Sequence, residues 1–374
     1  LKELAVEGWD KFEGKSPHKP WIDKVKIKHP ESGLIGTRIP DVGNPWLDAG
    51  IVPYSTLSYN QDREYWEKWF PADFVVECFP GQFRNWFYSL LAMSTIMEKK
   101  PPFKTLLGHA LVKDETGRDM HKSWGNAIWF EDAAEKMGVD VMRWLYASQN
   151  PEHNLNFGYG IADDVRKNLI TLWNTYSFFI TYANLDGFDP AVDLVSYDEY
   201  TNLDKWILSK TQKLIKESQE CYSTFKVFQL MKTVTKFIDD LSNWYVRRSR
   251  RRFWRSENNI DKKAAYSALY EVLVNLSKVV SPIIPFISDK IYQNLVLNET
   301  AEGYPQSIHL CSFPSFNDDL YDEELINKID AIISIVGLGR SARNKANIKN
   351  RQPLQKVFVY IPDDKNINLD ENSN

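Results

Sequence analysis

The sequence predicts an α/β segment up to about residue 160, followed by an all-α helix bundle. Two apolar runs, at residues 74–76 and 106–112, enclose a helical stretch, which is the pattern of a strand, a helix and a second strand. From Ala162 onward, apolar residues recur at steps of three and four almost without interruption. The chain has 374 residues, enough for two or three domains of about 150 residues each.

The first 70 residues show little helical periodicity and are rich in proline, glycine and aromatic residues. Residues 24–28 alternate as a short strand, and the turn residues 30–33 follow. Between the two apolar runs, helical spacing extends from Phe83 to Met97. A strand, a helix and a strand at this spacing form a βαβ unit, in which the strands are parallel and the crossover is right-handed.

The C-terminal part is expected to form a bundle of long helices joined by short polar links. Each helix is indicated by an apolar stripe, and Pro282 ends one of them. Helices are expected at 130–137, 139–147, 165–180, 224–254, 265–280 and 325–336. The apolar residues 357–360 indicate the beginning of a strand near the end of the chain.

The composition limits the classes of function. The chain carries 46 lysines and arginines against 50 acidic residues, a net charge of −4; this excludes a uniformly basic nucleic-acid-binding protein but permits a local basic surface. Cys78, Cys221 and Cys311 lie far apart without C-x-x-C spacing, which favours a reducing compartment such as the cytoplasm over a disulfide framework. No apolar run approaches the ~20 residues of a membrane-spanning helix.

The segment from Gly117 to Asn126 reads G-R-D-M-H-K-S-W-G-N and lies between a predicted strand and a predicted helix. At such a junction, a glycine-containing loop can present backbone N–H groups and the Lys122 ammonium to phosphate oxygens. The alternative is a solvated loop whose charges bind nothing. Taken alone, the local pattern favours this second interpretation, because lysine and serine after a strand are common.

The segment resembles the K-M-S-K-S loop of class I aminoacyl-tRNA synthetases, whose extended form is G-R-K-M-S-K-S-L-G-N. In that family, the loop closes on ATP and stabilises the departing pyrophosphate while the amino-acid carboxylate attacks the α-phosphorus. The resemblance implies that Lys122 and Ser123 are catalytic and that Met120, His121 and Lys122 contact ATP. Asp119 stands where the family has a lysine, and His121 would offset its negative charge in part.

Other segments resemble the same family in the same order. Residues 40–50 resemble D-V-W-F-D-S-G, and residues 70–87 resemble P-A-D-F-I-x-E-G-x-D-Q-x-R-G-W-F with one residue more and without the second aspartate. The second resemblance implies contacts to the aminoacyl-adenylate from Glu77, Gln82 and Trp86. His109 occupies the place of a family histidine near the adenosine. The structural alternatives are a loop-capping carboxylate for Glu77 and a hydrogen-bonded strand histidine for His109.

The run W-Y-V-R-R-S-R-R-R-F-W at residues 244–254 most resembles the isoleucine-specific members of the family, where it lies on the long helix of the anticodon-binding bundle. Residues 343–354 resemble R-x-K-x-x-I-K-x-R-Q-P-L of those members, which favours isoleucine over valine or leucine. The arginines of the run cannot all face one side of a helix. The sequence leaves two roles for these arginines open. They could contact tRNA phosphates, which would make binding salt-sensitive, or they could form ion pairs within the protein. The expected tRNA-binding residues are Arg247, Arg248, Arg251 and Arg252.

Residues 15–23 resemble the segment that follows the editing domain of the family. Many relatives continue with a C-P-x-C-G zinc knuckle, whereas this chain continues with H-P-E-S-G at residues 29–33. His29 and Glu31 are too few ligands for a structural Zn²⁺. We therefore predict neither a zinc site nor another metal site in this chain.

The resemblance covers almost the whole chain and implies four parts. These are a connective segment at 1–70, the second half of a Rossmann-like catalytic domain at 71–160, an α-helical anticodon-binding bundle at 161–335 and the start of a C-terminal extension at 336–374. The sequence has no H-I-G-H motif and no editing domain, and residue 1 is a leucine. We therefore expect it to be a piece of a longer protein.

The function implied by the resemblance is part of an isoleucine–tRNA ligase. Such an enzyme uses ATP with Mg²⁺ to form isoleucyl-adenylate and transfers isoleucine to tRNA(Ile). Its other partners would be the missing N-terminal catalytic half and the editing domain, and no membrane is implied. Alternatively, the isolated chain is a tRNA-binding and inter-domain module without activity of its own.

Overall fold

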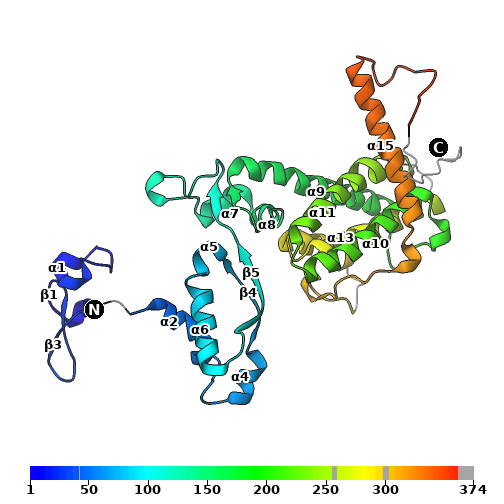
Figure 1. Ribbon diagram of the computed structural model, residues 1–374. Coiled ribbons are helices and arrows are strands. Elements are labelled where there is room, and N and C mark those ends of the chain that lie inside the picture. Colours follow the sequence, from blue (N-terminus) through cyan, green and yellow to red (C-terminus); the bar gives the residue numbers. More distant parts are fainter. Residues whose placement is uncertain (42, 255–258, 298–302, 361–374) are drawn as a thin grey trace. The chain divides into compact units, whose positions relative to one another are not determined.

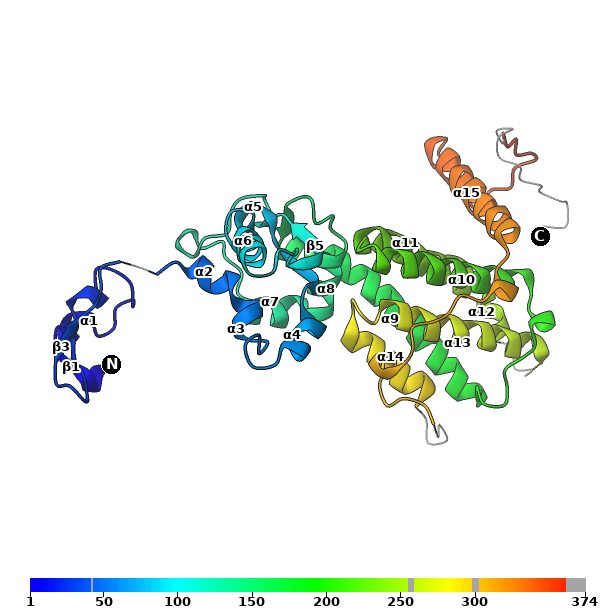
Figure 2. The same ribbon diagram turned by 60° about the horizontal axis from the view of Figure 1, so that its bottom comes forward.

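The computed structural model describes residues 1–374 except 42, 255–258, 298–302 and 361–374 (Figures 1 and 2). The chain divides into two compact units, Leu1–His109 and Ala110–Asn374. Within the described residues, no helix combines the length and the apolar composition that crossing a membrane requires.

The first unit opens with a small antiparallel sheet in the order β1-β2-β3. Its strands are β1 (Ala5–Glu7), β2 (Lys26–Lys28) and β3 (Ile35–Thr37), with the turn at 29–33 between the last two. The strand predicted at 24–28 is thus confirmed in its second half. Its first residue, Lys24, ends a short 3-10 helix, Ile22–Lys24; the other short helices here are Lys2–Leu4 and α1 (Trp9–Phe12).

The predicted βαβ unit is confirmed. Strands β4 (Ala72–Cys78) and β5 (Phe103–His109) are parallel, and α5 (Phe79–Gln82) and α6 (Trp86–Glu98) connect them. The predicted second strand, 106–112, is placed wrongly at both ends. The chain leaves β5 at Ala110, whose N–H donates to Pro151 O, and a separate strand begins at Val112, so the apolar run serves two sheets.

Three short helices precede β4: α2 (Pro45–Gly50), α3 (Val52–Ser55) and α4 (Arg63–Trp69). Helix α2 approaches α6 so closely that a Cβ on Gly50 would lie 2.9 Å from the Ser89 carbonyl oxygen. Glycine is therefore required at this crossing by lack of space. A small core of stacked rings fixes α4 beside α3; its buried members are Tyr54, Trp66 and Phe70.

The second unit begins with a two-stranded parallel sheet, formed by β6 (Val112–Asp114) and β7 (Leu155–Phe157). Between these strands lie α7 (Phe130–Met137) and α8 (Val139–Ala147), which confirm the two predicted helices. Gly138, at φ +88°, separates them, a conformation that glycine adopts without strain.

The predicted helix bundle is confirmed. Its helices are α9 (Tyr159–Asp186), α10 (Asn202–Ser223), α11 (Val227–Asp239), α12 (Arg247–Trp254), α13 (Ile260–Val280), α14 (Pro285–Val296) and α15 (Glu323–Lys345). Helix α13, buried along most of its length, packs against α10, α12 and α14 (Figure 2).

The long helix predicted at 224–254 runs from Val227 to Trp254, because a π-helical segment, Asp240–Val246, joins α11 to α12 without a break. The strand predicted at 357–360 is wrong: these residues are exposed and form no strand. A strand needs a partner for its backbone groups, and no described strand pairs with them. Residue 255, an arginine that directly follows the arginine-rich run at residues 244–254, lies outside the described residues.

Candidate functional site

The loop that follows β6 is organised around one carboxylate, that of Asp114. Its Oδ1 accepts hydrogen bonds from the backbone N–H groups of Thr116 and Arg118, both at 2.9 Å, and its Oδ2 accepts one from Asn126 Nδ2 at 2.8 Å. These bonds, the one from Asn126 foremost, hold the pKa of Asp114 well below its usual range. Asp114 is therefore ionised at neutral pH and fixes the base of the loop.

Asn126 closes the same loop from its other end. Its Nδ2 also donates to the Asp119 carbonyl oxygen at 2.8 Å, and its Oδ1 accepts the His121 N–H at 3.0 Å. A single side chain thus bridges the two halves of the loop. The amide suits this task because it offers both donors and an acceptor.

The negative charge of Asp119 is neutralised within the protein. Its carboxylate forms an ion pair with Lys113, whose side chain is only 15% exposed, and this contact holds the pKa of Asp119 below its usual range, with a smaller contribution from His121. The sequence pointed to His121 for this role and missed Lys113. Lys113 and Asp119 lie opposite each other in an isolated antiparallel bridge. Lys113 is the middle residue of β6, and nothing in the sequence indicated this pairing.

Met120, His121, Lys122 and Ser123 all lie on this loop, as predicted, and a 3-10 turn spans Lys122–Trp124. The side chain of Lys122 is exposed, and its Nζ lies 4.5 Å from the centre of the Trp129 ring. A cation on an exposed ring gains only about 0.5–1 kcal/mol. Lys122 can therefore leave Trp129, a contact that the sequence did not reveal, for a phosphate at little cost.

The other candidate residues lie in the first unit, at the carboxyl ends of β4 and β5. Glu77 pairs with Gly108 and Cys78 with His109, so Glu77 and His109 share one edge of the sheet. Glu77 Oε1 accepts the Cys78 N–H at 2.8 Å, which is the capping role that the sequence left as an alternative.

Gln82 is the last residue of α5, and Trp86, four residues later, is the first residue of α6. Gln82 Oε1 accepts the Trp86 N–H at 3.3 Å, and the Trp86 indole donates to the Ala49 carbonyl oxygen at 3.3 Å. The indole contact joins α6 to α2. Gln82 thus accepts a free N–H group at the N-terminus of α6.

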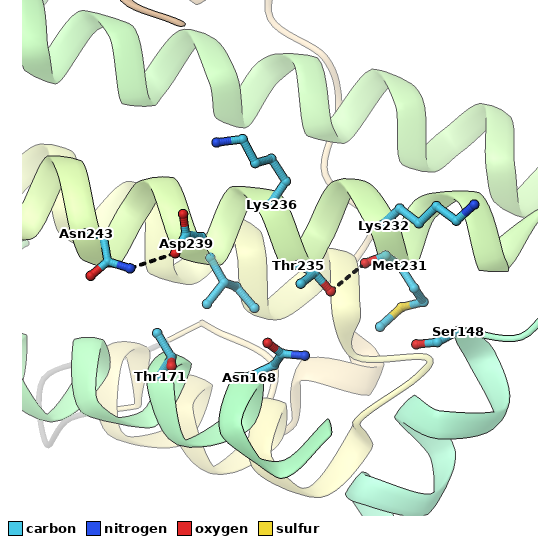
Figure 3. Close-up of a pocket in the computed structure, with 10 residues that line it drawn as sticks. Ser148, Asn168, Thr171, Met231, Lys232, Thr235, Lys236, Asp239 and Asn243 are labelled. Atoms are coloured by element: carbon cyan, nitrogen blue, oxygen red, sulfur yellow. Dashed lines mark hydrogen bonds between the residues drawn. The ribbon is translucent and has the colours of Figure 1, made fainter. Parts of the chain in front are cut away.

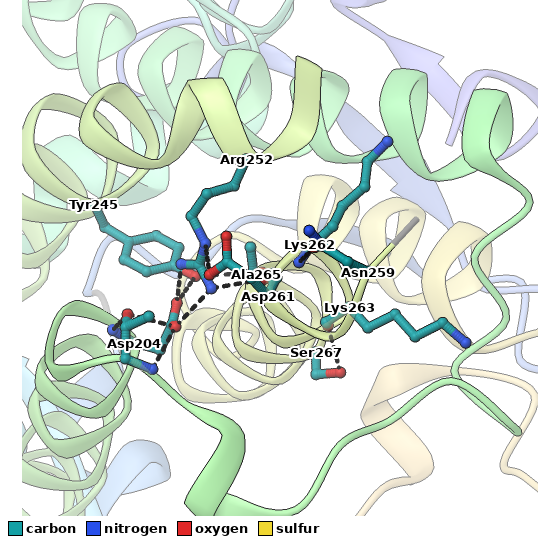
Figure 4. A network of polar contacts seen from close by, with 10 residues as sticks. Asp204, Tyr245, Arg252, Asn259, Asp261, Lys262, Lys263, Ala265 and Ser267 are labelled. Carbon is teal, nitrogen blue, oxygen red and sulfur yellow. Dashed lines mark hydrogen bonds and ion pairs between the residues drawn. The ribbon is translucent and has the colours of Figure 1, made fainter. Parts of the chain in front are cut away.

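Arg252 belongs to a polar network inside the bundle (Figure 4). Its guanidinium contacts both carboxylate oxygens of Asp204, at 2.8 and 2.9 Å, and its Nε lies 2.9 Å from Asp261 Oδ1. Asp204 is fully buried, and Arg252 is 13% exposed. The Tyr245 hydroxyl donates to the same carboxylate at 2.7 Å. For Arg252, this geometry supports the internal ion pair rather than a contact to tRNA.

The remaining arginines of α12 that were predicted to bind tRNA lie on the surface: Arg247, Arg248 and Arg251 are exposed. The Arg248 guanidinium lies 5.1 Å from the centre of the Trp244 ring, a cation–π contact within the continuous helix. Neighbouring arginines of α12 therefore differ in environment. Arg252 faces the interior of the bundle, and the other three predicted tRNA-binding arginines face solvent.

A pocket of about 580 Å³, lined mainly by polar residues, lies between α9 and α11 (Figure 3). Its lining residues are Ser148, Asn168, Thr171, Met231, Lys232, Thr235, Lys236, Ile238, Asp239 and Asn243. Lys236 is paired with Asp240 at 2.5 Å, and Asn243 donates to Asp239 at 2.6 Å. Asn243 lies one helical turn before Arg247, so the pocket and the exposed arginines follow each other along one continuous helix.

The prediction of no metal site stays a prediction. The His29 ring accepts the Ser32 N–H at 3.2 Å within the β2–β3 turn. Among the described residues, no group of three or more histidine, cysteine, aspartate or glutamate side chains is arranged to hold a metal ion.

Two family models match the chain. Residues 7–158 match the model for class I tRNA synthetases (I, L, M and V), and residues 204–358 match the model for the anticodon-binding domain of tRNA ligase. The chain belongs to the class I tRNA synthetases. The predicted fold class, a catalytic-domain piece followed by an anticodon-binding helix bundle, is confirmed.

Curated relatives of this synthetase chain are isoleucine–tRNA ligases. That of Clostridium acetobutylicum is 42% identical over 364 residues, which are 96% of this chain and 35% of the relative. That of Clostridium kluyveri is 39% identical over 96% of this chain, and that of Thermus thermophilus is 37% identical over 92%. The chain spans about a third of the length of these relatives.

Solved structures share the fold. The ternary complex of LeuRS, tRNA and LeuAMS from Agrobacterium radiobacter K84 matches 81% of this chain and 36% of that chain, with a TM-score of 0.58 at 16% identity. Mycobacterium tuberculosis methionyl-tRNA synthetase bound by methionyl-adenylate matches 78% of this chain and 60% of that chain, with a TM-score of 0.59 at 17% identity.

Proposed function

We propose that this synthetase chain is part of an isoleucine–tRNA ligase, which activates isoleucine with ATP and transfers it to tRNA(Ile). The observation that carries the proposal is the similarity to isoleucine–tRNA ligases over 96% of the chain. The loop geometry supports the chemistry, because Asp114 and Asn126 hold a folded loop from which the exposed Lys122 ammonium projects.

In this reaction, the loop residues neutralise charge on ATP, which enters as its Mg²⁺ complex. Lys122 would leave the Trp129 ring and contact phosphate oxygens as the bond to pyrophosphate breaks. Ser123 and the backbone of Met120 and His121 would add hydrogen bonds to the same phosphates. Because Asp119 is already paired with Lys113, it does not oppose this role. Such catalysis consists of positioning and stabilisation of developing negative charge.

The adenylate site would lie at the edge of the β4–β5 sheet. The carboxyl ends of parallel strands are where α/β sheets bind ligands, and Glu77 and His109 lie at those ends. We propose that Glu77 contacts the aminoacyl-adenylate, that His109 lies near its adenosine, and that Gln82 and Trp86 shape the wall of the site.

The sheet that would carry this site is incomplete in this chain. It has only β4 and β5 among the described residues, and an apolar groove of about 460 Å³ lies beside it, with Phe83, Tyr88 and Leu91 on its exposed wall. Large exposed apolar surfaces are usually covered by a partner. We propose that the N-terminal catalytic half, supplied by sequence outside this chain, covers it.

The chain by itself is therefore expected to show no isoleucine-dependent ATP–pyrophosphate exchange. Half of the proposed ATP site lies outside it, so neither the phosphates nor the adenosine can be held for reaction. The measurement is exchange of radiolabelled pyrophosphate into ATP, with the complete ligase as the positive control. Exchange by the chain alone would show that the residues described here already make a working site.

The proposed tRNA-contacting surface is formed by Arg247, Arg248 and Arg251 on α12 and by Lys232 at the pocket on α11. These side chains are exposed or line an open pocket, and their cations suit phosphates. The amide and hydroxyl groups of the pocket can in addition bind the edge of a base or a ribose. Arg252 is left out of this surface because Asp204 and Asp261 occupy its guanidinium.

Binding of tRNA(Ile) to the chain is expected to weaken steeply with added salt, since each phosphate contact releases counterions. Replacing Arg247, Arg251 or Lys232 with alanine should lower the slope of log Kd against log salt by about 1 each. Lys290→Ala, which removes an exposed cation from α14, is the matched control and should leave the slope unchanged. A flat salt response of the unmodified chain would assign the arginines to contacts between proteins.

We also propose that this ligase works in the cytoplasm. The support is chemical: Cys78, Cys221 and Cys311 are free thiols, as expected for a reducing compartment.

A further inference from the structure

We propose that Glu115 is a positioning residue that anchors the active-site loop to α9, the first helix of the bundle. Glu115 follows the last residue of β6, and α9 follows the last residue of β7. These strands are parallel, with Asp114 opposite Phe157, so the loop and the helix leave the sheet at the same edge. The catalytic consequence of the anchor rests on the proposed function, whereas the anchor itself does not.

The Glu115 carboxylate caps the N-terminus of α9. Its Oε1 accepts the Ile161 N–H at 3.0 Å. The residue at the N-cap position is Gly158, which has no side chain that could accept a hydrogen bond from the first turn. The first turn of α9 also contains no acidic residue. The free N–H groups and the positive end of the helix dipole need an acceptor, preferably an anion. The loop supplies that acceptor, over a sequence separation of 46 residues.

Two glycines make room for this carboxylate. A Cβ on Gly158 would lie 2.6 Å from Glu115 Cβ, and a Cβ on Gly160 would lie 2.4 Å from Glu115 Oε1. Neither glycine has a positive φ, so backbone conformation does not explain them. The reason for glycine at both positions is the space that Glu115 occupies.

A second contact of α9 holds the helix that follows the loop. Arg166 Nη2 donates to the carbonyl oxygens of Lys136 at 2.7 Å and of Met137 at 3.2 Å, which lie at the C-terminal end of α7. Helix α7 directly follows the loop. Thus α9 holds the chain both where the loop begins and at the end of the first helix after it.

These two anchors would determine where Lys122 can reach. Catalytic groups must be held within a few tenths of an ångström of their working positions, and Lys122 lies on the segment between the anchors. Loss of the Glu115 cap would leave Asp114 and Asn126 to hold the loop internally but would free it from α9. The expected defect is a lower rate of the chemical step, with unchanged binding of isoleucine.

The anchor is tested on the chain itself by amide hydrogen exchange. In Glu115→Ala, exchange at Ile161 and at loop residues 115–126 should accelerate, while exchange in α13 stays unchanged. Glu115→Gln retains Oε1 as an acceptor and should restore most of the protection. Glu135→Ala removes the same charge from an exposed site on α7 and should have no effect. Unchanged exchange of the loop in Glu115→Ala would overturn the proposal.

The catalytic consequence is tested in the complete ligase. Glu115→Ala should lower kcat of ATP–pyrophosphate exchange by roughly tenfold, the scale of a modest misplacement of a reacting group, with KM for isoleucine unchanged and with recovery in Glu115→Gln. Gly160→Ala, which displaces the carboxylate, should reproduce the defect. An unchanged kcat in Glu115→Ala would refute the positioning role. A complete ligase with no isoleucine-dependent exchange would refute the proposed function, while the hydrogen-exchange experiment would still decide on the anchor.

Discussion

Replacing Lys122 with alanine in the complete ligase is expected to slow isoleucine-dependent ATP–pyrophosphate exchange by roughly 10²–10³, the scale for loss of one group that stabilises transition-state charge. The ammonium is exposed and rests on Trp129, so it is available to phosphates and no part of the fold depends on it. The loss should appear in kcat, because the proposed contact strengthens as pyrophosphate departs. The measurement is steady-state exchange at saturating ATP and isoleucine.

Two controls separate this role from a general effect of charge. Lys104→Ala breaks an exposed ion pair with Asp73 and should leave the rate unchanged, since such pairs contribute little. Trp129→Ala removes only the ring that Lys122 contacts and should change the rate by no more than about fivefold, given that the ring contact is worth ~1 kcal/mol or less. A Lys122→Ala enzyme with the unmodified rate would show that another residue, with Arg118 or His121 as the nearest basic residues in sequence, carries this role.

Helix α8 and the loop after β6 show what the sequence could predict. Residues 139–147 carry a regular apolar stripe after Gly138, and the predicted helix has the observed bounds. Local periodicity determines such elements. The loop was placed correctly because its residue types and their order resemble a family motif. From this resemblance, Met120, His121, Lys122 and Ser123 were predicted to lie on one loop.

The contacts that shape the loop could not be predicted, because they join residues without a shared local pattern. Glu115 reaches Ile161 across 46 residues, and Lys113 faces Asp119 only because an irregular bridge turns the chain back. The error in the bounds of β5 has a similar cause. The apolar run 106–112 is shared between two sheets, and the Ala110 N–H between them donates to the Pro151 carbonyl oxygen. Periodicity cannot show which partner a strand residue will find.

The arginine-rich run at residues 244–254 is a second case in which the sequence could not identify a contact partner. Helical geometry indicated that some arginines had to turn inward, but it could not select Arg252, since its partner Asp204 lies 48 residues away. The selection depends on how α10 and α12 pack. The structure therefore separates a cation that holds the bundle together from those proposed to contact tRNA, and the two groups should respond differently to mutation.

Arg252→Ala is expected to lower the free energy of unfolding of the bundle by about 3–5 kcal/mol, the cost of leaving one member of a buried ion pair without its partner. Asp204 is fully buried. Besides Arg252, its carboxylate accepts hydrogen bonds from the Tyr245 hydroxyl at 2.7 Å and from the Thr201 N–H at 3.0 Å. Urea denaturation followed by far-UV circular dichroism measures the change.

Arg251→Ala is the matched control for this prediction. It removes the same side chain from the adjacent, exposed position and should change the stability by less than about 0.5 kcal/mol. Asp204→Ala should destabilise as strongly as Arg252→Ala, because it removes the buried carboxylate that both Nη groups of Arg252 contact. The Asp204→Ala/Arg252→Ala double variant should lose less than the sum of the two, since neither charge then stays buried alone. Additive losses, or a cost below about 1 kcal/mol for Arg252→Ala, would contradict the assignment of Arg252 to the core.

Because Arg252 is held inside the protein, its loss should also leave the salt slope of tRNA binding by the still-folded fraction unchanged, in contrast to the loss of Arg251.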